Sequence, residues 1–330
     1  MSHSTRGIHR RPYFFEIFAA LNFLLALTLL EGSTFLRVGH VLVGTINLLI
    51  HAFVSVCIRG AILRLRGQRG YFAAVRRRGW IVDTIRMAVF GTITVMTYGW
   101  IKLVVPIYHP RLFDQELWNL DQAMLLGVSP NVLLLDLLPN RWFLLTIDTT
   151  YAYVFFATFM VTLGYFLSEP SRRIRIAFSN GNTVLWITGA WLYMLVPSLG
   201  PAFRFPEIWF AYSQSLPRTQ YFQAMLMRNY QNVLRMSGGN GGADVQLILG
   251  IGAFPSLHVA FQTFVLLWVR RVWPSGQLLF AIFAAAILIG SVVTGWHYLI
   301  DGLAGIVIAL GCYEGAARAA RLPRLFALRK

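Results

Sequence analysis

The sequence predicts an all-α fold, a polytopic membrane bundle of about eight transmembrane helices. Hydrophobic residues make up 57% of the 330 residues and charged residues only 13%, whereas a soluble domain carries about 25% charged residues. The hydrophobic residues also fall into long stretches, close to the roughly 20 residues that a helix needs to cross a bilayer. No polar linker divides the chain, so we expect one membrane domain.

Eight stretches are long and apolar enough to be spans. They cover residues 13–30, 41–58, 84–107, 142–167, 183–200, 254–273, 277–296 and 299–317. The first stretch lacks the small-residue cleavage site of a signal peptide, so we expect it to remain as an anchor. Cys57 and Cys312 lie inside apolar segments, at no spacing typical of a metal site, and are expected to be packing residues.

The basic residues predict the orientation of the bundle. They gather at both termini and in every even-numbered loop, which the positive-inside rule assigns to the cytoplasm. These residues are Arg6, Arg10, Arg11, Arg59, Arg64, Arg66, Arg69, Arg76, Arg77, Arg78, Arg172, Arg173, Arg175, Arg270, Arg271, Arg318, Arg321, Arg324, Arg329 and Lys330. The net charge of +16 therefore reflects membrane topology, and we expect no nucleic-acid partner.

Two of the outer loops are long. In residues 108–141, apolar side chains recur at helical spacing around Trp118 and predict a short amphipathic helix, either in the membrane interface or capping the bundle. Residues 201–253 include the glycine-rich run 237–242, which would be a mobile lid or a connector.

Two histidines and an aspartate are predicted to meet at the outer face. His258 begins the sixth stretch, His297 follows the seventh and Asp301 begins the eighth, so all three reach one depth. Ionisable groups against hydrocarbon are costly and are usually functional. On a helix, residues four apart share a face, so Asp301 could accept the Nδ1–H of His297 and leave Nε2 free to attack. His258 would then carry the proton.

This cluster suits a phosphoryl transfer without metal, which needs donors around the phosphate oxygens. Ser256 and the backbone amides at the start of the sixth stretch are candidate donors. Arg204 is the first candidate for the phosphate-binding cation, because it follows the outer end of the fifth stretch. Weaker candidates lie in the same loop: Arg218, Arg228 and Arg235.

Several alternatives remain open. The histidines could be structural residues, and a metal could bind two histidines and one aspartate, although that set lacks the fourth ligand of a closed site. We expect no metal and no other cofactor. Asp148, inside the fourth stretch, could bind a polar headgroup or make a structural hydrogen bond. Lys102 is expected to extend to the outer interface.

The motifs around the histidines resemble those of the type 2 phosphatidic acid phosphatase superfamily. Its Pro-Ser-Gly-His motif corresponds to Pro255-Ser256-Leu257-His258, and the end of its Ser-Arg-x5-His-x3-Asp motif corresponds to His297 and Asp301. With Leu257 in place of glycine, the first motif is similar to the inositol phosphorylceramide synthase branch. The outer loop is similar to that branch at Asp114, Leu117, Leu120, Asp121, Gly127 and Pro130.

The chain also departs from the phosphatases of this superfamily. Gly290-Ser291 stands where their Ser-Arg pair would fall, and the segment from Pro197 to Arg204 takes the place of their Lys-x6-Arg-Pro motif. Two phosphate-binding cations are therefore absent or relocated. The synthase branch also lacks the Ser-Arg arginine, so this departure favours the synthase branch.

The resemblance implies a six-helix catalytic core at residues 84–317. Residues 1–83 would add two N-terminal helices with a basic loop, and residues 318–330 a basic cytoplasmic tail. It also implies a two-step reaction, in which His297 attacks the phosphorus of a phospholipid such as phosphatidylinositol and His258 protonates the departing diacylglycerol. A ceramide-like lipid alcohol then takes the phospho-headgroup. Substrate contacts would come from Ser256, Leu257, Arg204 and Asp148.

Two other functions are compatible with the sequence. A lipid phosphate phosphatase would keep the same catalytic residues and use water as the acceptor. A channel or transporter would need a polar row through the spans, where only isolated polar residues occur. The partners we expect are the bilayer, a phospholipid donor and a lipid-alcohol acceptor, and the oligomeric state is not predicted.

Overall fold

A computed structural model describes residues 11–29, 38–138, 140–237, 245–246 and 249–323. The described residues form helices and connecting turns, with no β-strand among them. The fold prediction, a polytopic helical membrane protein, is confirmed. The glycine-rich run from 238 onward, together with the first ten and last seven residues, lies outside the described residues.

A helix lies at each of the eight predicted positions. The long helices are α1 (Phe14–Leu29), α2 (Val38–Leu65), α4 (Arg78–Tyr108), α7 (Arg141–Thr149) continuing through η1 (Thr150–Val154) into α8 (Phe155–Leu167), α9 (Arg172–Leu195), α13 (Leu257–Val272), α14 (Gln277–Val293) and α15 (Leu299–Ala319). The connecting segments form α3 (Tyr71–Val75), α5 (Asp114–Met124), α6 (Pro130–Leu137), α10 (Pro201–Arg204), α11 (Pro206–Phe210), η2 (Ser213–Ser215), α12 (Pro217–Ser237) and η3 (Pro274–Gly276). The helix expected around Trp118 is α5.

Five of the described helices are long and apolar enough to cross a membrane: α2, α4, the continuous helix from Arg141 to Leu167, α14 and α15. Helix α1 is apolar but shorter. Helices α9 and α13 coincide with predicted spans and are less uniformly apolar. Helix α13 packs against α9, α14 and α15, and a helix surrounded by protein needs no continuous apolar surface.

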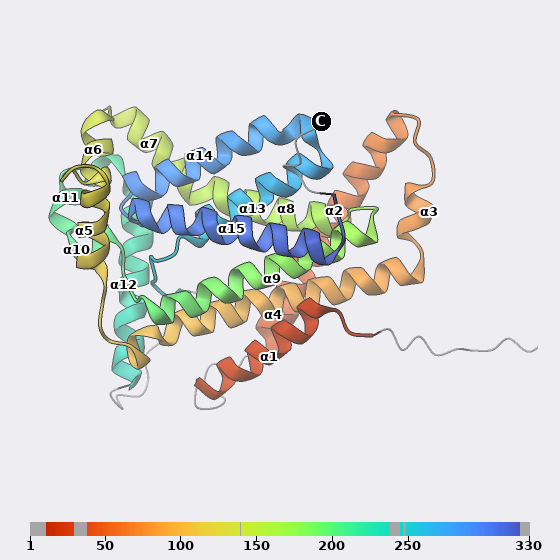
Figure 1. Ribbon diagram of the computed structural model, residues 1–330, viewed down its shortest axis with the longest axis horizontal. Coiled ribbons are helices and arrows are strands. Elements are labelled where there is room, and N and C mark those ends of the chain that lie inside the picture. Colours follow the sequence, from red (N-terminus) through yellow and green to blue (C-terminus); the bar gives the residue numbers. More distant parts are fainter. Residues whose placement is uncertain (1–10, 30–37, 139, 238–244, 247–248, 324–330) are drawn as a thin grey trace, which may run out of the picture.

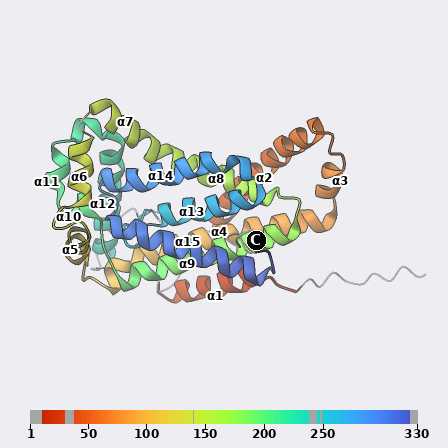
Figure 2. The ribbon, with the colours of Figure 1, turned by 45° about the horizontal axis from the view of Figure 1, so that its top comes forward.

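The long helices run side by side and alternate in direction (Figures 1 and 2). One end of the bundle carries α3, the start of α1 and the end of α15. The opposite end carries the short helices α5, α6, α10 and α11, and α12 runs across it (Figure 1). The loops that hold the histidines lie at this second end, because α13 and α15 start there and α14 ends there.

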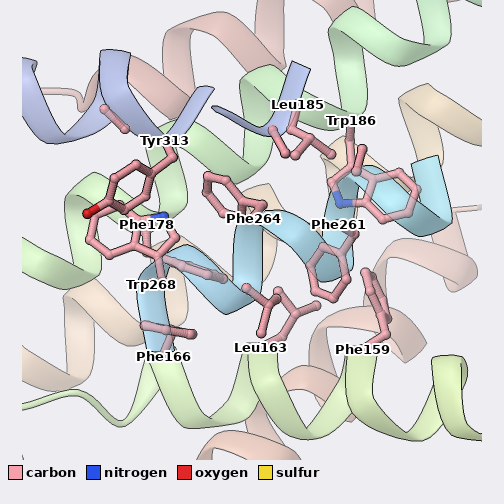
Figure 3. Packing of buried hydrophobic residues seen from close by; sticks show 14 of the residues in the cluster. Phe159, Leu163, Phe166, Phe178, Leu185, Trp186, Phe261, Phe264, Trp268 and Tyr313 are labelled. Atoms are coloured by element: carbon pink, nitrogen blue, oxygen red, sulfur yellow. The ribbon is translucent and has the colours of Figure 1, made fainter. Parts of the chain in front are cut away.

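Aromatic side chains fill the centre of the bundle. Figure 3 shows Phe159 and Phe166 of α8 meeting Phe261, Phe264 and Trp268 of α13, with α9 and α15 closing the cluster. The side chains of Phe261, Phe264 and Trp268 are fully buried. This packing fixes α13, which begins with the histidine motif.

Helices α13 and α15 also touch through their backbones. A Cβ added at Gly305 of α15 would lie 2.4 Å from the carbonyl oxygen of Ser256. Only glycine allows this approach. The contact holds the start of α13, with His258, against the start of α15, with Asp301.

Candidate active site

A cavity of about 640 Å³ lies between η1, α8, α12 and the segment 249–252. Its wall is mainly apolar and aromatic, with Phe155 and Phe156 on one side and Phe222 and Met225 of α12 on another. Three side chains with basic nitrogen also line it: Lys102, His258 and His297. No carboxylate of a described residue lines the cavity. Both predicted histidines therefore face one apolar chamber.

His258 is the second residue of α13, and aromatic rings hold its imidazole. The ring centroid of Phe155 lies 4.2 Å away in an edge-to-face arrangement, and that of Tyr151 lies 5.5 Å away. Tyr151 belongs to the π-helical turn η1, and Phe155 directly follows it. Such a turn is a helix distortion often found at functional sites. Among the described residues, none hydrogen-bonds a ring nitrogen of His258, so its nitrogens are available to a ligand.

His297 lies 5.8 Å from His258 between ring centroids, in the loop between α14 and α15. Its Nδ1 is 2.9 Å from the carbonyl oxygen of Ala253 and 3.3 Å from Oδ2 of Asp301. A carbonyl oxygen can only accept a hydrogen bond, so Nδ1 carries the proton. The neutral imidazole then has its lone pair on Nε2. Burial lowers the pKa of His297 well below its ordinary value, and the charges of His258 and Lys102 act in the same direction.

Asp301 reaches His297 by a route different from the expected one. The two residues were predicted to share a helix face, but α15 begins at Leu299 and His297 precedes it. Asp301 instead forms a capping box at the start of α15, where Oδ2 accepts the backbone N–H of Tyr298 at 3.0 Å. The cap turns the carboxylate back toward the imidazole.

Comparisons with known proteins identify the family. The family model of the PAP2 superfamily matches residues 115–314, which include both histidines and Asp301. The chain belongs to the PAP2 superfamily. Its members are phosphatases or phosphotransferases, which indicates activity on lipid phosphates. No curated protein and no solved structure matched the chain.

The structure of this PAP2 protein places the other predicted substrate-binding residues away from the cavity wall. Ser256 is fully buried, and its hydroxyl caps α13 by accepting the N–H of Val259 at 3.4 Å. Leu257 is buried against Gly189. Arg204 is exposed, with its guanidinium 5.3 Å from the ring of Phe205.

Asp148 has a structural environment. Its fully buried carboxylate accepts the backbone N–H groups of Arg218 and Thr219, at 2.9 and 2.8 Å. Both donors belong to the first turn of α12, whose N–H groups have no partner within the helix. Asp148 therefore attaches α12, and with it one wall of the cavity, to the bundle.

Two buried aspartates of α5 hold the loops of the active site. Asp121 accepts the N–H groups of Leu299 and Ile300 at 2.6 and 2.8 Å, at the start of α15. Asp114 accepts the hydroxyl of Tyr298 at 2.9 Å and the N–H of Gly200 at 2.8 Å. Burial raises the pKa of both carboxyl groups. Helix α5 thus positions the segment that carries His297 and Asp301.

Replacing Asp121 with asparagine should lower both stability and activity. The amide replaces one of the two acceptor oxygens by a donor facing an N–H group, which should cost about 1–3 kcal/mol of unfolding free energy. The shifted start of α15 should lower turnover about tenfold or more. Thermal unfolding and initial rates in detergent measure the two effects. The control is Asp136→Asn, since Asp136 is exposed on neighbouring α6. If Asp121→Asn and Asp136→Asn had equal unfolding temperatures and equal initial rates, Asp121 would not position the start of α15.

Lys102 is the cavity residue that the sequence did not identify. It was expected to extend to the membrane interface, yet it lines the same chamber as the two histidines. Helix α4 lies outside the segment that the PAP2 family model matches. Only the packing of α4 against α9 and α12 reveals which of its faces borders the cavity.

Proposed function

We propose that the protein is a membrane phosphotransferase that moves a phospho-headgroup from a glycerophospholipid to a lipid alcohol through a phosphohistidine on His297. The observation that carries the proposal is the pair of histidines on one apolar cavity. One has its Nδ1 proton held by Ala253 and Asp301, and the other has no hydrogen-bond partner among the described residues. The first arrangement suits a nucleophile and the second suits a proton carrier.

The reaction proceeds in two steps. The Nε2 lone pair of His297 forms a bond to phosphorus, the bond from phosphorus to the diacylglycerol oxygen breaks, and protonated His258 gives its proton to that oxygen. Neutral His258 then takes the proton of the acceptor hydroxyl, whose oxygen bonds to phosphorus as the bond to Nε2 breaks. Asp301 balances the positive charge that the His297 ring carries between the steps.

The wall of the cavity supports lipid substrates. Tyr153 and Phe156 line it, and they are also 55% and 63% exposed on the outer surface of the α7–α8 helix. The cavity wall therefore continues onto a surface that faces lipid when this helix spans a membrane. A lipid can move sideways from the bilayer into the chamber with its phosphate toward the histidines.

The transferred group we propose is phosphoinositol, and the acceptor a ceramide-like alcohol. This choice rests on the motif with Leu257 and on the outer loop with Asp114 and Asp121, which resemble the inositol phosphorylceramide synthase branch. The apolar wall also favours a lipid alcohol over water as acceptor. We place the site on the extracytoplasmic face and both termini in the cytoplasm, because the arginine-rich segments belong to the opposite end of the bundle.

Incubation with inositol-labelled phosphatidylinositol and ceramide in mixed micelles tests the proposal. We expect a labelled sphingolipid in wild-type samples and none in a His297→Ala variant. Free labelled inositol phosphate without labelled sphingolipid would favour a phosphatase that uses water. Labelled sphingolipid at equal rates in both samples would contradict the phosphohistidine route.

A further inference from the structure

Lysine is rare in this chain, and one of its two lysines lines the active-site cavity. The only lysines are Lys102 and Lys330, whereas the other basic residues are arginines. Lys102 sits on α4, five residues before the end of the predicted span 84–107, and shares the chamber with His258 and His297. A cation within a membrane helix is costly, so its position needs a specific partner.

The surrounding residues hold the side chain of Lys102 in place. Its Nζ lies 3.3 Å from the hydroxyl of Tyr98 and 5.1 Å from the ring centroid of buried Tyr193. A Cβ added at Gly250 would lie 3.0 Å from Lys102 Cγ, and one at Gly252 would lie 3.2 Å from Cε. Two glycines thus allow the segment before the histidine motif to pack along the whole lysine stem.

No carboxylate of a described residue forms an ion pair with Lys102. Asp301, the carboxylate of the site, hydrogen-bonds His297 and the start of α15 instead. Tyr98 and Tyr193 offer aromatic faces and a neutral hydroxyl, which stabilise a cation without neutralising it. The chamber therefore holds one positive charge that lacks a negative partner, and a bound anion would supply it.

We propose that Lys102 binds the phosphate group of the lipid substrate and is the phosphate-binding cation that the sequence motifs do not provide. The proposal deepens the proposed function and rests on it for the lipid nature of the substrate. An ammonium group is a compact point charge that can contact non-bridging phosphate oxygens. Fixed positive charge beside the transferring phosphoryl group stabilises the transition state. The same charge helps to keep His297 neutral, as attack by Nε2 requires.

Equilibrium binding of two short-chain lipids tests the assignment. Dioctanoyl phosphatidic acid carries the phosphate, and dioctanoylglycerol is the same lipid without it. Titration calorimetry on a His297→Asn background removes turnover from the measurement, so the result does not depend on whether the enzyme transfers or hydrolyses. We compare Lys102→Met and Lys102→Arg with the control Arg141→Met, which removes an exposed charge at the start of α7.

We expect Lys102→Met to weaken phosphatidic acid binding at least about tenfold, because a desolvated charge pair is lost. Lys102→Arg should stay within about threefold of the parent, since it keeps the charge. Dioctanoylglycerol should bind all variants equally. Unchanged phosphatidic acid binding in Lys102→Met would overturn the proposal. So would a parallel loss of both lipids in both lysine variants, which would make Lys102 a structural residue. Because no step of this test depends on turnover, phosphate binding by Lys102 and the proposed transfer reaction can fail independently.

Discussion

Replacing His297 with alanine should abolish turnover, with a loss of at least about 10⁴-fold in kcat. The variant lacks the Nε2 lone pair, and among the described residues no backbone carbonyl fixes the tautomer of His258. Phospholipid labelled with ³²P at the phosphate reports the intermediate directly, because wild-type protein should retain acid-labile label after a rapid quench and the variant should retain none.

His109→Ala is the matched control for this variant. His109 follows the last residue of α4 at the same end of the bundle, and its Nδ1 lies 2.9 Å from the carbonyl oxygen of Met194. Its ring thus makes the same kind of backbone hydrogen bond as His297, outside the cavity wall. The control should keep most of its activity and acquire label normally. Label in His297→Ala protein at the wild-type level would assign the covalent step to another residue.

The sequence predicts the helical bundle and the meeting of its histidines. Both depend on the length of the apolar stretches and on the alternating direction of successive spans. A span must be long and apolar, and successive spans must run in opposite directions. Those two rules place His258, His297 and Asp301 at one end of the bundle before any contact is known. The helices at two predicted spans, α9 and α13, are not among the five described helices that are long and apolar enough to cross a membrane. Helix α13 packs against α9, α14 and α15, so protein covers much of its surface.

The sequence does not show which groups surround the histidines, because that depends on helix rotation and on backbone atoms. The carbonyl of Ala253 holds the Nδ1 proton of His297, and no side-chain motif records it. Asp148 is buried by α12, seventy residues later in the chain. Lys102 faces the cavity because of how α4 packs. Lysine is rare in this arginine-rich chain, which sets Lys102 apart, but composition alone cannot show that it lines the cavity.

Replacing Asp301 with asparagine should lower kcat by about 10²–10³-fold and leave the fold intact. The amide oxygen can still accept the N–H of Tyr298 and the Nδ1–H of His297, so the change removes charge more than geometry. In a Ser-His-Asp triad the corresponding change costs about 10⁴-fold, through the wrong tautomer. Here Ala253 holds the tautomer independently. The expected loss is therefore smaller and reflects the unbalanced positive charge on the phosphorylated ring.

Single-turnover rates and thermal unfolding of Asp301→Asn and Asp301→Ala separate this charge effect from capping. The alanine variant loses the cap of α15 and should unfold at lower temperature, whereas the asparagine variant should unfold close to wild type. A slow asparagine variant with wild-type stability supports charge balance by Asp301. An asparagine variant that turns over at the wild-type rate would reduce Asp301 to a helix cap, and Ala253 alone would then orient His297.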